Sequence, residues 1–98
     1  MYRIIDGRGT GKTGRLMLLA KETNGTIVCN NPRAMRDKAH AYGIIGVDFI
    51  SYNDFLLGGV GTQVGTYYID ELESFLYAVQ CAAGVKGVLN GYSLSEDD

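Results

Sequence analysis

The strongest constraint on this chain is a glycine-rich stretch near its start, residues 6–13, which reads Asp-Gly-Arg-Gly-Thr-Gly-Lys-Thr. It follows a short apolar run at 2–5 and precedes a leucine-rich segment at 16–20 that is typical of a helix. Because Gly9 and Gly11 lack a Cβ, the backbone can turn tightly and point its N–H groups at an anion. The start of the helix adds its own unpaired amides. The stretch therefore predicts a phosphate-binding loop.

Two side chains at the end of this loop carry the predicted chemistry. Lys12 can reach the β- and γ-phosphates of a nucleotide, and the Thr13 hydroxyl can hold a Mg²⁺. Asp6 stands where the pattern G-x-x-x-x-G-K-[ST] has its first glycine, and a carboxylate there is an electrostatic liability beside a triphosphate. The residues predicted to bind the nucleotide are Gly7, Arg8, Gly9, Thr10, Gly11, Lys12, Thr13 and Gly14.

Composition favours one small globular domain over residues 1–98, with a frayed acidic tail at 95–98. No apolar run approaches the roughly 18 residues of a membrane span, and the first residues do not have the pattern of a signal peptide. Cys29 and Cys81 do not form a C-x-x-C pair, so both are expected to be buried thiols in a reducing compartment. We therefore expect a cytoplasmic protein without a membrane partner.

Charge is divided unevenly along the chain. Before residue 40 there are eight Lys and Arg against three Asp and Glu, a net +5, and from residue 40 onward there is one against eight, a net −7. A basic first part can face nucleic acid. The phosphate loop and solvated helix faces explain the same asymmetry more simply.

The pattern of apolar and turn-forming residues predicts strands alternating with helices. Strands are expected at 2–5, 26–29, 47–52, 67–69 and 85–89. Helices are expected at 11–22, 32–42 and 71–83, a short turn at 53–57, and a mobile glycine-rich loop at 58–65. This alternation predicts an α/β domain in which helices cover both faces of a parallel sheet.

A second motif follows the strand expected at 67–69, where Asp70 and Glu71 stand side by side. In open α/β sheets, ligands bind beyond the carboxyl ends of the strands, so these carboxylates are expected near the phosphate loop. Asp70 would then contact Mg²⁺, and Glu71 would orient the attacking water. The alternative is that both acids only favour the start of the next helix. The glycine loop and the acidic pair together favour nucleotide binding.

The glycine loop at 7–13, the Asp70-Glu71 pair and a polar residue ending the next strand resemble the additional-strand, catalytic-glutamate division of P-loop NTPases. That division includes RecA-like ATPases, helicases and phage terminase ATPases. The resemblance implies a three-layer α/β/α domain with a five-stranded, mainly parallel sheet in the order 5-1-4-3-2. It also places Asn90 at the sensor position for the γ-phosphate.

The resemblance further implies Mg-dependent binding and hydrolysis of ATP. Lys12, Glu71 and Arg8 would be catalytic, and Thr13 and Asp70 would hold the metal. A second lobe would normally complete such a site, so self-assembly into a homo-oligomer or a protein partner is expected.

Two other functions stay open. One is a nucleotide-dependent binding module that does not hydrolyse ATP, and the other is an ATPase acting with helicase-like or terminase-like DNA-processing machinery.

Overall fold

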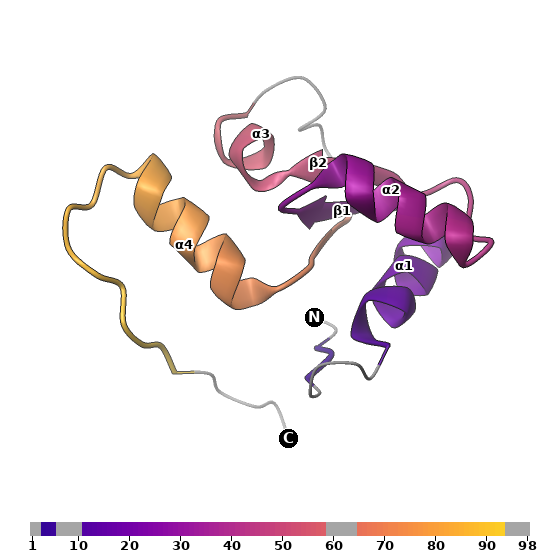
Figure 1. Cartoon of the computed structure of the whole chain (residues 1–98), viewed down its shortest axis with the longest axis horizontal. Coiled ribbons are helices and arrows are strands. Elements are labelled where there is room, and N and C mark those ends of the chain that lie inside the picture. The colour runs from indigo at the N-terminus through magenta and orange to yellow at the C-terminus, as the bar shows by residue number, and fades with distance from the viewer. Residues whose placement is uncertain (1–2, 6–10, 59–64, 94–98) are drawn as a thin grey trace.

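The computed structural model describes residues 3–5, 11–58 and 65–93 (Figure 1). Within these ranges it contains helices α1 (Lys12–Glu22), α2 (Pro32–Ala41), α3 (Tyr52–Leu56) and α4 (Leu72–Ala82) and strands β1 (Thr26–Cys29), β2 (Asp48–Ser51) and β3 (Tyr67–Ile69). These bounds agree with the expected helices at 11–22, 32–42 and 71–83, and with the three middle strands, to within one or two residues. None of the described helices has the length and apolar character needed to cross a bilayer.

The strands form one parallel sheet in the order β2-β1-β3. Val28, in the middle of β1, is paired with Ile50 of β2 on one side and Ile69 of β3 on the other. The apolar run of β1 suits this central place, because a strand with neighbours on both sides and helices on both faces has no side facing water.

The prediction of a five-stranded sheet in the order 5-1-4-3-2 is wrong. Residues 3–5 and 85–89 are not in strands. The order is wrong as well, because residues 26–29 lie between 48–51 and 67–69, whereas the predicted order places the strand at 47–52 in the middle. The central strand is the most buried one. Ile27 and Val28 of β1 are fully buried, whereas no residue of β2 or β3 is fully buried.

The segment predicted as the fifth strand lies beside α4 instead of in the sheet. The Gln80 side chain of α4 donates a hydrogen bond to the Gly87 carbonyl and accepts one from the Leu89 N–H, at 3.0 Å. Val85, Val88 and Leu89 remain exposed. Residues 85–89 therefore have the sequence pattern of a strand, but their backbone hydrogen bonds are made with the side chain of a helix residue, Gln80.

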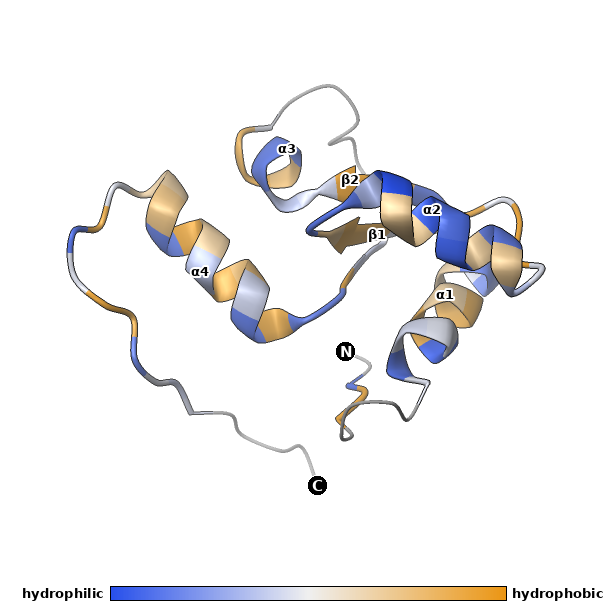
Figure 2. Cartoon of the chain, in the orientation of Figure 1, coloured by the Kyte–Doolittle hydropathy of each residue, from blue (hydrophilic) through white to orange (hydrophobic). Residues whose placement is uncertain are grey.

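The two faces of the sheet hold separate apolar clusters. Alternate side chains point to opposite faces, so Ile27 and Cys29 pack on one side with Met17 of α1 and Met35 of α2. Val28 packs on the other side, in a cluster with residues of α3 and α4. Figure 2 shows that α4 is largely apolar along its length, yet none of its residues is fully buried.

Candidate functional site

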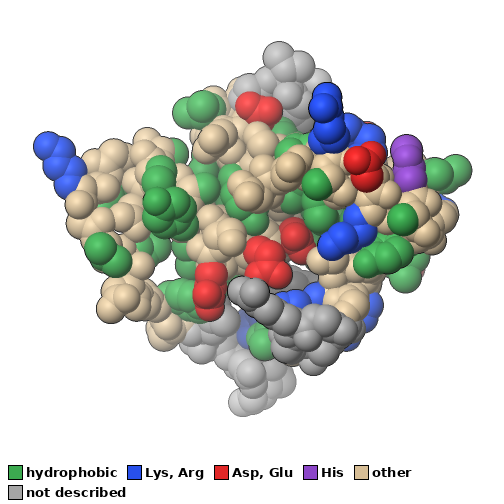
Figure 3. All heavy atoms as spheres, in the orientation of Figure 1, with side chains coloured by type: hydrophobic (Ala, Val, Ile, Leu, Met, Phe, Trp, Pro, Cys, Tyr) green, Lys and Arg blue, Asp and Glu red, His purple; other side chains and the backbone are tan. Residues whose placement is uncertain are grey.

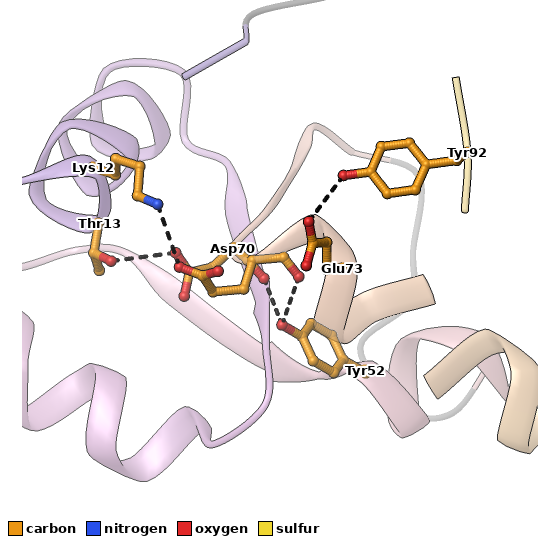
Figure 4. Close-up of polar contacts among 7 residues, drawn as sticks. Lys12, Thr13, Tyr52, Asp70, Glu73 and Tyr92 are labelled. Atoms are coloured by element: carbon orange, nitrogen blue, oxygen red, sulfur yellow. Dashed lines mark hydrogen bonds and ion pairs between the residues drawn. The ribbon is translucent and has the colours of Figure 1, made fainter. Parts of the chain in front are cut away.

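The end of β3 meets the start of α1 at the carboxyl edge of the sheet. The Asp70 N–H donates to the Val28 carbonyl at 2.9 Å, which carries the pairing of β3 with β1 one residue beyond the strand. The Asp70 carboxylate then faces α1, where the Thr13 hydroxyl donates to Oδ1 at 3.3 Å (Figure 4). The structure thus joins the two predicted metal ligands, which are 57 residues apart in the chain.

The neighbouring residues of the same two motifs also meet. Lys12 Nζ lies 3.8 Å from Glu71 Oε1, in an ion pair whose side chains are 25% and 56% exposed. Figure 4 shows Lys12 and Thr13 on the same end of α1, both directed at the turn that follows β3. Four of the predicted site residues, two from each motif, therefore converge on one place.

This convergence argues against the simpler explanation that the two acids only cap α4. Glu71 is the N-cap residue of α4, but no side chain caps that helix end. Glu73, two residues further on, is the acid in the first turn of the helix. The carboxylates of Asp70 and Glu71 contact α1 instead of their own helix.

The turn that carries these carboxylates has a strained backbone. Glu71 has a φ of 58°, a left-handed conformation that residues other than glycine rarely adopt. The Tyr52 hydroxyl donates to the carbonyl oxygens of Asp70, at 2.5 Å, and Glu71, at 3.3 Å. Tyr52 is itself buried and lies edge-on to Phe75, with ring centroids 5.6 Å apart. The contact from α3 therefore holds the turn in place.

Tyr52 is a site residue whose role the sequence analysis did not predict. Its only sequence signal is its place at the end of the strand expected at 47–52, at the edge where ligands bind.

Negative charge is concentrated around Asp70. Burial raises the pKa of this carboxyl and the Glu71 carboxylate raises it further, against the opposing effects of the Thr13 hydrogen bond and of Lys38 and Lys12. Burial, and then the Asp70 charge, raise the pKa of the Cys29 thiol to about 11. The same two causes raise the pKa of Tyr52 to about 12. A cation placed beside Asp70 would relieve this repulsion.

Thr13 and Asp70 supply two oxygen donors. This donor set suits Mg²⁺ better than it suits a metal ion whose ligands all come from the protein. Across the described ranges, no three His, Cys, Asp or Glu side chains gather into a metal-binding group. Mg²⁺ commonly takes one or two protein carboxylates and completes its shell with water and substrate phosphates. One hydroxyl and one carboxylate at the start of a helix match that requirement.

The other predicted site residues have different outcomes. Gly7, Arg8, Gly9 and Thr10 lie outside the described residues, as does most of the predicted loop at 58–65, so the amide cup and the role of Arg8 stay predictions. Gly11 is the N-cap of α1 with a φ of 79°, and Gly14 follows in its first turn.

Asn90 is exposed in the segment after α4. The sensor prediction requires a strand end at this position, and the described residues contain no strand there.

A cavity of about 590 Å³ adjoins the site between α3 and α4. Asn30 follows β1 and Ser51 ends β2, so the cavity opens at the same carboxyl edge of the sheet as Asp70. Tyr52 lines it and also bonds the turn at Asp70 and Glu71. The polar residues at strand ends indicate this edge in the sequence, but the cavity depends on the placement of α4.

The fold and the site together define a small α/β domain with a three-stranded parallel sheet and a helix start facing two carboxylates. The chain matches no protein-family model, no curated protein and no solved structure. The functional argument therefore depends on the geometry of the site.

Proposed function

We propose that this chain is a minimal P-loop domain that binds Mg·ATP and hydrolyses it. The observation that carries the proposal is the hydrogen bond between Thr13 and Asp70, with Lys12 and Glu71 paired beside it. A threonine and an aspartate at the meeting of a helix start and a strand end are the pair that holds magnesium in such domains. The lysine before the threonine is the residue that binds the phosphates.

Each residue has a distinct role in this proposal. Lys12 and the amides at the start of α1 bind the phosphates. The ion pair between Lys12 and Glu71 is partly exposed, so it is weak enough for a triphosphate to displace it. Glu71, once released, orients the water that attacks the γ-phosphorus. Arg8 neutralises charge that develops on the phosphate.

Thr13 and Asp70 would hold the magnesium, which supplies further positive charge on the phosphate oxygens when it is bound.

The test is release of inorganic phosphate from Mg·ATP, together with calorimetric binding. Lys12→Ala should abolish both binding and turnover. Glu71→Gln should keep binding and lower turnover by roughly 100-fold or more, the contribution of a positioned general base. Glu22→Gln, at the exposed end of α1, is the control and should match wild type. Unchanged binding in Lys12→Ala would contradict the proposal.

A second candidate is a nucleotide-binding module that does not hydrolyse ATP. It is favoured by the exposure of the Glu71 side chain, because a general base acts best where water is excluded. Equal and negligible turnover in wild type and Glu71→Gln, with binding that still depends on Lys12, would select this candidate.

The cellular setting is also a proposal. Both cysteines are free, which is compatible with a reducing, cytoplasmic compartment. Cys29 is buried as expected, but the expectation for Cys81 is wrong: it is exposed on α4 because this helix is covered only on part of its surface. Arg33, Arg36 and Lys38 lie exposed on α2, where a nucleic acid or a second copy of the chain could bind.

A further inference from the structure

The cavity between α3 and α4 has the size of a small-molecule site. Its volume of about 590 Å³ falls inside the range of roughly 300–1,000 Å³ that is typical of ligand pockets. It lies at the carboxyl edge of the sheet, which is the side of an α/β domain where ligands bind. None of the roles proposed above for hydrolysis uses this space.

The chemistry of its lining selects an uncharged aromatic ligand. Tyr77 is 67% exposed, so its ring is accessible for stacking. The side-chain amides of Asn30 and Asn53 each offer a donor and an acceptor, which is what the edge of a nucleobase requires. The described lining residues include no Lys or Arg, whereas Glu73 adds a carboxylate, so an anion is disfavoured.

Glu73 also has the chemistry to bind a sugar. A carboxylate commonly accepts hydrogen bonds from ribose hydroxyls in nucleotide-binding α/β domains. In the structure its Oε1 already accepts one such bond, from the Tyr92 hydroxyl at 3.3 Å (Figure 4). A hydroxylated sugar could replace this exposed contact with a similar one.

The cavity and the phosphate site share one turn of the chain. Tyr52 lines the cavity and holds the carbonyls of Asp70 and Glu71, while Glu73 follows two residues later on α4. Figure 3 shows acidic side chains gathered in this central part of the surface. A cavity without Lys or Arg among its described lining residues thus borders a site that has a lysine and a magnesium-type donor pair.

We propose that this cavity binds a nucleoside, either the base and sugar of the bound triphosphate or a separate nucleoside beside it. The first of these two sources, the bound triphosphate, rests on the proposed function. The nucleoside site itself does not, since it is argued from the lining residues alone. Tyr77 stacks on the base, Asn30 and Asn53 bind its edge, and Glu73 binds the sugar.

Calorimetry with four probes in the presence of magnesium tests the assignment: ATP, GTP, inorganic tripolyphosphate, and adenosine added at saturating tripolyphosphate. If the cavity holds the nucleoside of the triphosphate, ATP or GTP should bind at least roughly 10-fold more tightly than tripolyphosphate, the scale of one stacked base. Tyr77→Ala should remove that difference without changing the affinity for tripolyphosphate. If the nucleoside is a separate molecule, adenosine should bind at saturating tripolyphosphate and Tyr77→Ala should abolish it.

Asn53→Ala should act in the same direction as Tyr77→Ala with a smaller fold-change. Leu57→Ala is the matched control, because Leu57 is exposed like Tyr77 but does not line the cavity. Equal affinities for ATP, GTP and tripolyphosphate that depend on Lys12 but not on Tyr77, with no binding of adenosine, would overturn the inference and leave the phosphate site standing. If none of the phosphate probes binds, the proposed function is rejected. Binding of adenosine alone then tests the nucleoside site: binding that depends on Tyr77 supports the site, and absence of binding rejects it.

Discussion

The two faces of the sheet are packed to different degrees. On the face covered by α1 and α2, Met17, Ala20 and Ile27 are completely buried. On the face covered by α3 and α4, Val28 is buried, but α4 contributes no fully buried residue and leaves Leu72 and Tyr77 exposed. The cavity borders this second, looser face, whereas the Asp70 carboxylate is bonded to Thr13 of α1, at the carboxyl edge of the sheet. The comparison teaches that stability is concentrated on one face, that the cavity lies on the other, and that the candidate phosphate site lies at the edge between them.

The largest expected effect tests this division directly. Met17→Ala should lower the free energy of unfolding by about 2–5 kcal/mol, because it leaves a cavity in the fully buried cluster. Phe75→Ala on α4 should cost less, since Phe75 is only partly buried. Urea denaturation of both variants measures the difference. A larger loss for Phe75→Ala would show that the α4 face is the more stable one.

A second prediction concerns the close approach of β1 and β3 on the well-packed face. A Cβ on Gly25 would lie 2.7 Å from Cε2 of Tyr68 and 3.1 Å from the Thr66 carbonyl oxygen. Gly25→Ala should therefore destabilise the protein by about 1–3 kcal/mol through overpacking. Gly87→Ala is the control, because a Cβ there meets nothing within 4 Å. Equal midpoints in thermal unfolding for the two variants would contradict the described packing.

The third prediction addresses the link between α3 and the site. Tyr52→Phe removes the hydrogen bonds to the Asp70 and Glu71 carbonyls and should cost about 1 kcal/mol of stability. It should also weaken Mg·ATP binding, because the strained turn at Glu71 loses its support. Tyr67→Phe, on β3 of the same face, is the comparison variant for affinity. Loss of stability with unchanged affinity would limit Tyr52 to a structural role.

The smallest effect concerns pH. The pKa of Asp70 is raised in the folded protein, chiefly by burial, so its contribution to stability is full below its ordinary value of 3.8 and is lost as pH rises through the folded pKa. The ionised carboxylate is therefore a cost at neutral pH. Asp70→Asn should raise the unfolding midpoint at pH 7 and flatten its change between pH 4 and pH 7, while Mg·ATP binding falls.

Denaturation across that pH range, with and without Mg·ATP, measures both effects. A lower midpoint for Asp70→Asn at pH 7 would show that the ionised carboxylate stabilises the fold.

Local pattern was enough to predict α1, α2, α4 and the three middle strands, because each has a clear apolar pattern and recognisable ends, whereas α3 (Tyr52–Leu56) was expected only as a short turn at 53–57. Asn31 caps α2 with its side chain, accepting from the Ala34 N–H at 3.1 Å, and Pro32 begins the helix as expected. The meeting of Thr13 with Asp70 was also predicted, but for a reason that holds only in part: Asp70 follows β3 at the carboxyl edge, whereas residues 3–5 do not form the strand that was expected to place the loop there.

The order of the strands depends on long-range competition for the central place, which local pattern does not record. The prediction of a fifth strand was wrong for a related reason. The segment from Val85 to Leu89 has a strand-like composition, but its backbone is hydrogen-bonded to the Gln80 side chain instead of to a neighbouring strand. Tyr52 and the cavity depend on how α3 and α4 meet, and this placement involves contacts distant in sequence.

The contact of Gln80 with the chain after α4 has a consequence for association between molecules. The Gln80 side-chain amide supplies both a hydrogen-bond donor and an acceptor, as the backbone of a neighbouring strand would. In the sheet of the described residues β3 pairs only with β1, so it is an edge strand. By bonding the Gly87 carbonyl and the Leu89 N–H, Gln80 occupies two of the backbone groups through which this strand-like stretch would add to an edge strand of another copy, and strand addition of that kind is a route to aggregation.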